Sequence, residues 1–138
     1  MYSCRMIGVI FSDLGLASSF MALKWVQCAL EQSLGFTPFP ATLNVRPKSA
    51  ADAETWRRVR DESPGLPLAS AEGGFCSARL YPVNIRAGED YAREATRGAI
   101  LLPHVKDYPN DKIEIVAPVR LKDHLGLRDG DALTLEFH

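Results

Sequence analysis

The sequence predicts a mainly β fold, a small barrel of short strands with one or two flanking helices. Apolar or alternating segments of the kind that form strands recur at residues 6–11, 41–46, 75–85, 99–102, 112–119 and 133–137. Helical periodicity is confined to two segments, residues 20–34 and 49–60. Many short strands with few helices are typical of a barrel with elaborated loops. With 138 residues, 46% of them hydrophobic, the chain suits a single domain over residues 1–138.

The first predicted strand and the first predicted helix are joined by a loop suited to an anion. Residues 6–11 are almost all apolar, and small, turn-forming residues follow at 12–19. The next segment has apolar residues at helical spacing, at Leu23, Val26, Leu30 and Leu34. Ser18 or Ser19 can cap this helix and Gly35 can end it. The loop therefore turns free backbone N–H groups toward its surroundings, where an anion would bind favourably.

The second predicted helix, residues 49–60, is more polar. Ser49 can cap it, acidic residues stand in its first turn, and three arginines lie near its end, an order that suits the helix dipole. Only Trp56 and Val59 give the helix an apolar face. We therefore expect it to lie at the periphery.

Composition restricts the classes of function. The chain has 16 basic and 17 acidic residues and a net charge of −1, whereas a duplex-binding surface usually carries a basic excess, so nucleic acid is not the expected partner. No apolar run reaches the roughly 18 residues of a membrane span, and the first residues lack the apolar segment of a secretory signal. We expect a cytoplasmic protein without a membrane partner.

The cysteines indicate neither disulfides nor a zinc site. Cys4, Cys28 and Cys76 are far apart, odd in number and without a CxxC pair. The three histidines share no metal-ligand spacing with them. We expect buried free thiols in a reducing compartment.

Common nucleotide-binding and nucleophile motifs are absent, namely GxxxxGK[ST], GxGxxG and GxSxG. A weaker candidate is the pair Thr42 and Asn44, which stand two residues apart in a predicted strand and so share one face. Both offer neutral oxygens, and Mg²⁺ prefers oxygen ligands. A Thr–Asn pair that merely hydrogen-bonds a neighbouring strand is the commoner case.

Two further candidates lie at or beyond one strongly apolar strand. Glu114 stands between two isoleucines, where a carboxylate either faces solvent, the commoner case, or is buried against a specific donor. Arg120 and Lys122 bracket the start of a helical turn expected at 121–127, before an Asp-Gly tight turn at 128–131. The two cations could meet phosphates, although a solvated surface pair is more frequent.

Taken together, in this order and spacing, these segments resemble the CTP-dependent riboflavin kinase family typical of archaea. The resemblance is carried by Phe20 and by residues 8–12, 14–15, 34–38, 42–45, 108–109, 113–121 and 125–131. It leaves out an insert at about 49–60. The resemblance implies a cradle-loop β-barrel of the RIFT type, Mg²⁺, and transfer of the γ-phosphoryl group of CTP to the riboflavin 5′-hydroxyl. The implied ligands are riboflavin or FMN and CTP or CDP; neither an oligomeric state nor a general base is indicated.

The resemblance also implies roles for individual residues. Thr42 and Asn44 correspond to metal ligands, and Glu114 corresponds to a carboxylate that contacts the flavin. The nucleotide would be held by the loop after the first strand and by a second segment, at Leu14, Gly15, Val119, Arg120, Leu121 and Lys122. Catalysis in such a site depends mainly on alignment and charge neutralisation.

Three segments depart from the family pattern. The loop usually written SGLGEG reads SDLGLA at residues 12–17; Asp13 adds a negative charge near the phosphates, and Asp13 and Ala17 each add a Cβ. Ala41 replaces the glycine before Thr42. The segment usually written PERTHYP reads PHVKDYP, so that Lys106 replaces the threonine that contacts the flavin. A changed donor or acceptor is therefore open.

Three hypotheses follow. The leading one is a riboflavin kinase-like enzyme that uses a nucleotide and Mg²⁺. The second, supported by Asp13, Ala17 and Lys106, is a non-catalytic flavin- or nucleotide-binding protein on the same barrel. The third is a DNA-binding regulator, since residues 118–137 resemble the swapped-hairpin strands of transition-state regulators, but the net charge disfavours it.

Overall fold

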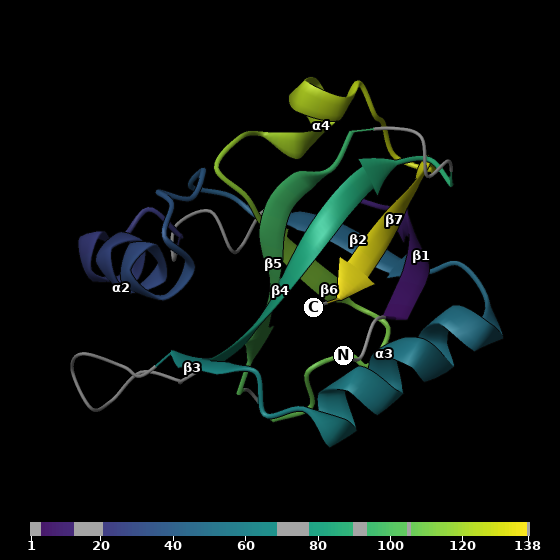
Figure 1. Cartoon of the computed structure of the whole chain (residues 1–138), viewed down its shortest axis with the longest axis horizontal. Coiled ribbons are helices and arrows are strands. Elements are labelled where there is room, and N and C mark those ends of the chain that lie inside the picture. Colours follow the sequence, from purple (N-terminus) through teal and green to yellow (C-terminus); the bar gives the residue numbers. More distant parts are fainter. Residues whose placement is uncertain (1–3, 13–20, 69–77, 90–93, 105, 138) are drawn as a thin grey trace.

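The computed structural model describes residues 4–12, 21–68, 78–89, 94–104 and 106–137, and its centre is a closed antiparallel barrel (Figure 1). Within these residues one sheet runs in the order β3-β4-β5-β6-β2-β1-β7, and pairing of β4 with β7 closes six of its strands into the barrel, leaving β3 as an extra strand. The strands are β1 (Cys4–Ile10), β2 (Leu43–Pro47), β3 (Leu66–Leu68), β4 (Ala78–Ala87), β5 (Thr96–Pro103), β6 (Ile113–Val116) and β7 (Ala132–Phe137). The predicted mainly β barrel is confirmed.

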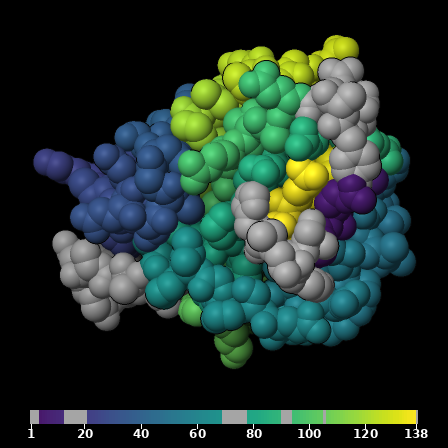
Figure 2. Space-filling view, in the orientation of Figure 1, coloured from purple at the N-terminus to yellow at the C-terminus, as the bar shows by residue number. Residues whose placement is uncertain are grey.

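The barrel interior is filled by the alternate side chains of its strands, as the period of two predicts. Residues such as Val45, Ile115 and Leu135 are fully buried there. A second apolar cluster lies on the outside of the barrel, where α2 (Lys24–Leu34) packs its apolar face against Leu101 and Val116. Figure 2 shows α2 covering one side of the molecule. All four residues of β6 are therefore buried.

The helix α3 (Ala50–Glu62) closes one end of the barrel (Figure 1). The Ser49 hydroxyl accepts a hydrogen bond from the Asp52 N–H at 3.2 Å, which confirms the predicted cap. Trp56 is 1% exposed, edge-on to Tyr81 with ring centroids 5.4 Å apart and stacked on Phe137 at 6.2 Å. Trp56 and Val59 are the buried residues of α3, as predicted, so the helix lies at the periphery while its tryptophan reaches the main core.

Of the two caps predicted for α2, the structure confirms only the C-terminal one. The Gly35 N–H donates to the Glu31 carbonyl at 2.8 Å and Gly35 has a φ of 79°, so the predicted C-cap is confirmed. Leu23 occupies the N-cap position, so no serine caps this helix, contrary to prediction. Ser18 and Ser19 lie outside the described residues. The apolar repeat continues before the helix begins, and this hides its start.

Several other boundaries and one burial prediction also differ. The strand β3 was not predicted, because three residues that include Pro67 show no periodicity. The strand predicted at 112–119 ends at Val116, after which the chain turns into α4 (Leu121–Leu125). Cys28 is exposed on the face of α2 away from the barrel, so the prediction of a buried thiol is wrong there; Cys4 is half-buried and Cys76 lies outside the described residues. Among the described helices, none has the length and apolarity needed to span a membrane.

Candidate functional site

The pairing of β2 with β6 places the predicted metal and flavin residues side by side. Asn44 is directly opposite Glu114 in the antiparallel register. Their neighbours Leu43, Val45, Ile113 and Ile115 fill the barrel interior, so Asn44 and Glu114 lie on the outer face. Thr42, two residues before Asn44, reaches the same carboxylate. The structure therefore brings all three predicted residues together.

Glu114 is a buried carboxylate held by two hydroxyl groups. Glu114 is 6% exposed. The Thr42 hydroxyl donates to Oε1 at 3.1 Å, and the Tyr108 hydroxyl donates to Oε2 at 2.5 Å. Of the two alternatives open from the sequence, burial against specific donors is the one observed. Sequence reasoning missed the link from Tyr108 to Glu114, and only the Tyr-Pro pair in the family segment marked this residue.

Asn44 carries an unpartnered polar atom. Its side-chain Oδ1 is buried and accepts no hydrogen bond from any described residue. Buried polar atoms are nearly always paired, so an unpaired amide oxygen calls for a ligand. Thr42 shows the alternative expected of a Thr–Asn pair, a hydrogen bond to the neighbouring strand, but the Asn44 oxygen does not.

The residues present fit a hard divalent cation. The Asn44 amide oxygen and the Thr42 hydroxyl oxygen are neutral, hard donors of the kind that Mg²⁺ accepts alongside substrate phosphates and water. The Thr42 hydroxyl donates its single hydrogen to Glu114, so the lone pairs of its oxygen remain available to a cation. Among the described residues no group of three or more His, Cys, Asp or Glu side chains could hold a metal ion. Softer, imidazole- or thiolate-rich metal sites are therefore not found in this part of the chain.

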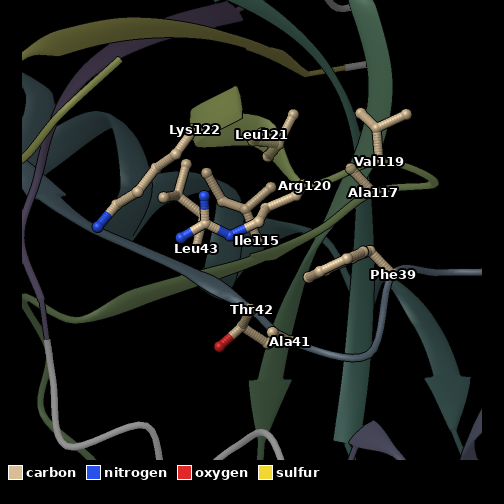
Figure 3. Close-up of a pocket in the computed structure, with 10 residues that line it drawn as sticks. All are labelled: Phe39, Ala41, Thr42, Leu43, Ile115, Ala117, Val119, Arg120, Leu121 and Lys122. Atoms are coloured by element: carbon tan, nitrogen blue, oxygen red, sulfur yellow. The ribbon is translucent and has the colours of Figure 1, made fainter. Parts of the chain in front are cut away.

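A cavity of about 120 Å³ connects Thr42 with the predicted nucleotide segment (Figure 3). Thr42 and Ala41 border it on one side, and the start of α4 borders it on another. All four residues predicted for the second nucleotide segment line it, namely Val119, Arg120, Leu121 and Lys122. One metal candidate, Thr42, and this segment thus line the same cavity, whereas Asn44 is not among its lining residues. Leu14 and Gly15, with Asp13 and Ala17, lie outside the described residues.

The two cations of this segment are each matched by a carboxylate. Lys122 Nζ lies 2.9 Å from Asp129 Oδ1 and 3.3 Å from the Ser12 hydroxyl, which itself donates to Asp129 Oδ2 at 2.5 Å. The hydrogen bonds from Lys122 and then Ser12 hold the pKa of Asp129 below its usual value. Arg120 pairs with Asp123 at 2.7 Å in an exposed position, where an ion pair contributes little stability. Phosphates would therefore have to share or displace these carboxylates.

A larger cavity, of about 580 Å³, lies at the α3 end of the barrel. Val59, Leu66, Tyr81 and Phe137 are among its mostly apolar lining residues. It contains none of the predicted site residues. The predicted site residues therefore favour the smaller cavity, which is lined by Thr42, Arg120 and Lys122.

Comparison with known proteins connects this arrangement to a family. A family model labelled CTP-dep_RFKase and described as "Domain of unknown function DUF120" matches residues 10–137, including the insert that the sequence resemblance left out. A riboflavin kinase of Pyrobaculum arsenaticum is 35% identical over 137 residues, which are 97% of this chain and 60% of the relative. One of Pyrobaculum calidifontis is 37% identical, with 99% and 61% covered. One of Aeropyrum pernix is 36% identical, with 90% and 88% covered.

The length of the match differs among these relatives. The chain spans about three-fifths of the Pyrobaculum proteins but 88% of the Aeropyrum protein. The matched part of each contains nearly all of this chain, with its barrel strands and its candidate site. The chain belongs to the CTP-dependent riboflavin kinase domain family.

Proposed function

We propose that the chain transfers the γ-phosphoryl group of CTP to the 5′-hydroxyl of riboflavin, giving FMN and CDP. The bond between the γ-phosphorus and its bridging oxygen breaks, a bond to the flavin hydroxyl oxygen forms, and the proton of that hydroxyl is released to water. The observation that carries the proposal is the grouping of Thr42, Asn44 and Glu114 on one face of the β2–β6 pair, with the Asn44 Oδ1 atom unpartnered. Family membership and relatives named riboflavin kinase support it.

In this proposal Thr42 and Asn44 hold Mg²⁺. When bound, the cation neutralises charge on the phosphate oxygens, the main requirement of phosphoryl transfer. Thr42 would contribute its hydroxyl oxygen and Asn44 its amide oxygen, both without a charge of their own. The two residues would then leave most of the coordination shell to phosphate oxygens and water, as is usual for Mg²⁺ in nucleotide sites.

Lys122 and Arg120 would bind the nucleotide phosphates at the cavity beside Thr42. Lys122 is partly buried, with a side chain 27% exposed, and Asp129 and Ser12 hold its ammonium group. A held cation loses less conformational entropy when a phosphate arrives. Ser12 also opens the loop predicted to bind the nucleotide, so this contact connects the two nucleotide segments.

Glu114 would orient the flavin hydroxyl. Each of its oxygens accepts one hydrogen bond within the protein, and each carboxylate oxygen can accept a second. The carboxylate can therefore receive a substrate O–H while Thr42 and Tyr108 keep it in place. These soluble ligands require neither a nucleic acid nor a membrane, in keeping with the expected cytoplasmic location.

The experiment that tests the proposal is conversion of riboflavin to FMN, followed by chromatography of the flavins. We expect FMN only when CTP and Mg²⁺ are both present, and none after chelation of the metal. Parallel reactions with ATP, GTP and UTP define the donor. Absence of FMN with all four nucleotides would contradict the proposal.

One observation favours a second candidate, a flavin-binding protein without catalysis. Lys106 stands where the family has a threonine that contacts the flavin, and its side chain is exposed. Flavin fluorescence separates the two candidates. A non-catalytic protein would bind riboflavin equally with and without CTP and Mg²⁺, whereas the kinase would bind it more tightly with nucleotide and then form FMN.

A further inference from the structure

Tyr108 lies in the loop between β5 and β6 in an unusual backbone setting. The preceding residue, Asp107, has a φ of 63°, in the left-handed region that non-glycine residues rarely adopt. Such conformations persist where the surrounding structure holds them, and they are concentrated at functional sites. The Tyr108 ring packs against the edge of the barrel core, and Lys112 Nζ lies 5.8 Å from its centroid. The ring is thus held on two sides.

The Tyr108 hydroxyl and the Thr42 hydroxyl are joined through the carboxylate of Glu114. Tyr108 donates to Glu114 Oε2 at 2.5 Å, and Thr42 donates to Glu114 Oε1 at 3.1 Å. Glu114 is buried, so each of its oxygens depends on these protein donors. Without the Tyr108 donor, the carboxylate would be free to rotate toward Thr42 or away from it. The direction of the Thr42 hydroxyl hydrogen therefore depends on Tyr108.

We propose that Tyr108 is a positioning residue for the cation site. By fixing Glu114 it directs the Thr42 hydrogen away from the cation, so that the Thr42 lone pairs and the Asn44 Oδ1 atom face the same ligand. Tyr108 would act on the cation through Glu114 and Thr42. This inference rests on the proposed function, because it takes Thr42 and Asn44 as the cation ligands.

The test is Mn²⁺ binding, measured by electron paramagnetic resonance in the presence of CDP, so that no turnover is needed. Tyr108→Phe keeps the packed ring and removes only the hydroxyl donor. We expect it to weaken Mn²⁺ binding about tenfold, the lower end of the loss seen when partners of metal ligands are removed. Tyr81→Phe is the matched control, because the buried Tyr81 hydroxyl donates to the Ser63 carbonyl at 3.0 Å, at the α3 end.

A second comparison separates positioning from a general loss of structure. Both tyrosine variants lose one hydrogen bond, so both should lower the thermal midpoint by similar amounts, but only Tyr108→Phe should change Mn²⁺ affinity. In a Glu114→Ala background, Tyr108→Phe should have no further effect, because its acceptor is gone.

Three results would overturn the inference in distinguishable ways. Wild-type protein that binds Mn²⁺ with the same affinity as Tyr108→Phe would remove the role of Tyr108 and leave the proposed function standing. Additive effects of Tyr108→Phe and Glu114→Ala would show that Tyr108 acts by another route. Failure of the wild-type protein to bind Mn²⁺ with CDP would contradict the proposed function together with the inference.

Discussion

The two ends of the barrel differ in the side chains that they bring together. At one end α3 inserts Trp56 between Tyr81 and Phe137, and the tryptophan is 1% exposed. At the other end the five-residue α4 covers a small cavity lined by Thr42. Asn44, two residues further along, has an Oδ1 atom without a partner among the described residues. The larger cavity belongs to the first end. An unpaired polar atom, rather than the volume of a cavity, therefore marks the candidate site.

Replacement of Trp56 by alanine should produce the largest effect on folding. Loss of a fully buried tryptophan costs about 3–5 kcal/mol of the free energy of unfolding, which urea denaturation would measure. Riboflavin and nucleotide affinities of the fraction that stays folded should be unchanged, because the site lies at the other end. A loss of affinity in folded protein would show that the two ends are coupled.

Asn44→Ala should lower activity strongly and stability little, the opposite of Trp56→Ala. We expect FMN formation to fall on the order of 100-fold, because a direct ligand contributes at least as much as the 10–100-fold typical of its supporting partners. The thermal midpoint should change little, since the deleted oxygen makes no hydrogen bond within the described residues. Steady-state kinetics measures the rate of FMN formation, and calorimetry measures the thermal midpoint. Full activity with reduced stability would assign Asn44 to the fold instead.

Lys122→Met should raise the KM for CTP by about tenfold, the loss of roughly one charge-assisted hydrogen bond to a phosphate. Lys48→Met is the matched control, because Lys48 also pairs with a carboxylate, Glu89, at 2.6 Å but lies away from the cavity. The KM of the control should equal that of the wild type. Equal effects of both substitutions would indicate nonspecific attraction by positive charge.

The smallest effect concerns Asp129. Its pKa is lowered from the ordinary 3.8, first by the hydrogen bond from Lys122 and then by that from Ser12. Because the folded pKa is depressed, the contribution of this carboxylate to stability is present above pH 3.8 and is lost as the pH falls through the lower folded value. Carboxyl NMR titration should show the pKa rising toward 3.8 in Lys122→Met. An unchanged pKa would exclude Lys122 as the main cause.

Local features of the fold could be predicted, and long-range ones could not. The alternation in strands, the Ser49 cap and the Gly35 end of α2 depend on neighbouring residues and agree with the structure. The strand β3 forms because it pairs with β4. A segment of three residues is too short for its sequence to predict that pairing. The peripheral position of α3 could be predicted, but the contacts of Trp56 could not, because the partners of its ring come from β4 and β7.

In the candidate site, too, local features could be predicted and long-range contacts could not. Spacing placed Thr42 and Asn44 on one face, and their positions in the sequence singled out Glu114, Arg120 and Lys122. The family resemblance assigned roles to these residues, and the structure brings them to one region. The hydrogen bonds from Tyr108 to Glu114 and from Lys122 to Asp129 join loops or helix ends to other elements. The periodicity of the sequence cannot predict these hydrogen-bonded pairs, because their residues come together only when the barrel closes.

The most direct test of where the site lies is the paramagnetic effect of Mn²⁺ on the amide NMR spectrum of the protein with CDP. We predict that broadening is strongest for Thr42, Asn44 and Glu114, extends to Lys122, and is much weaker for the Trp56 indole signal at the α3 end. Broadening centred on Trp56 and Tyr81, beside the larger cavity, would contradict the assignment of the site to the β2–β6 face.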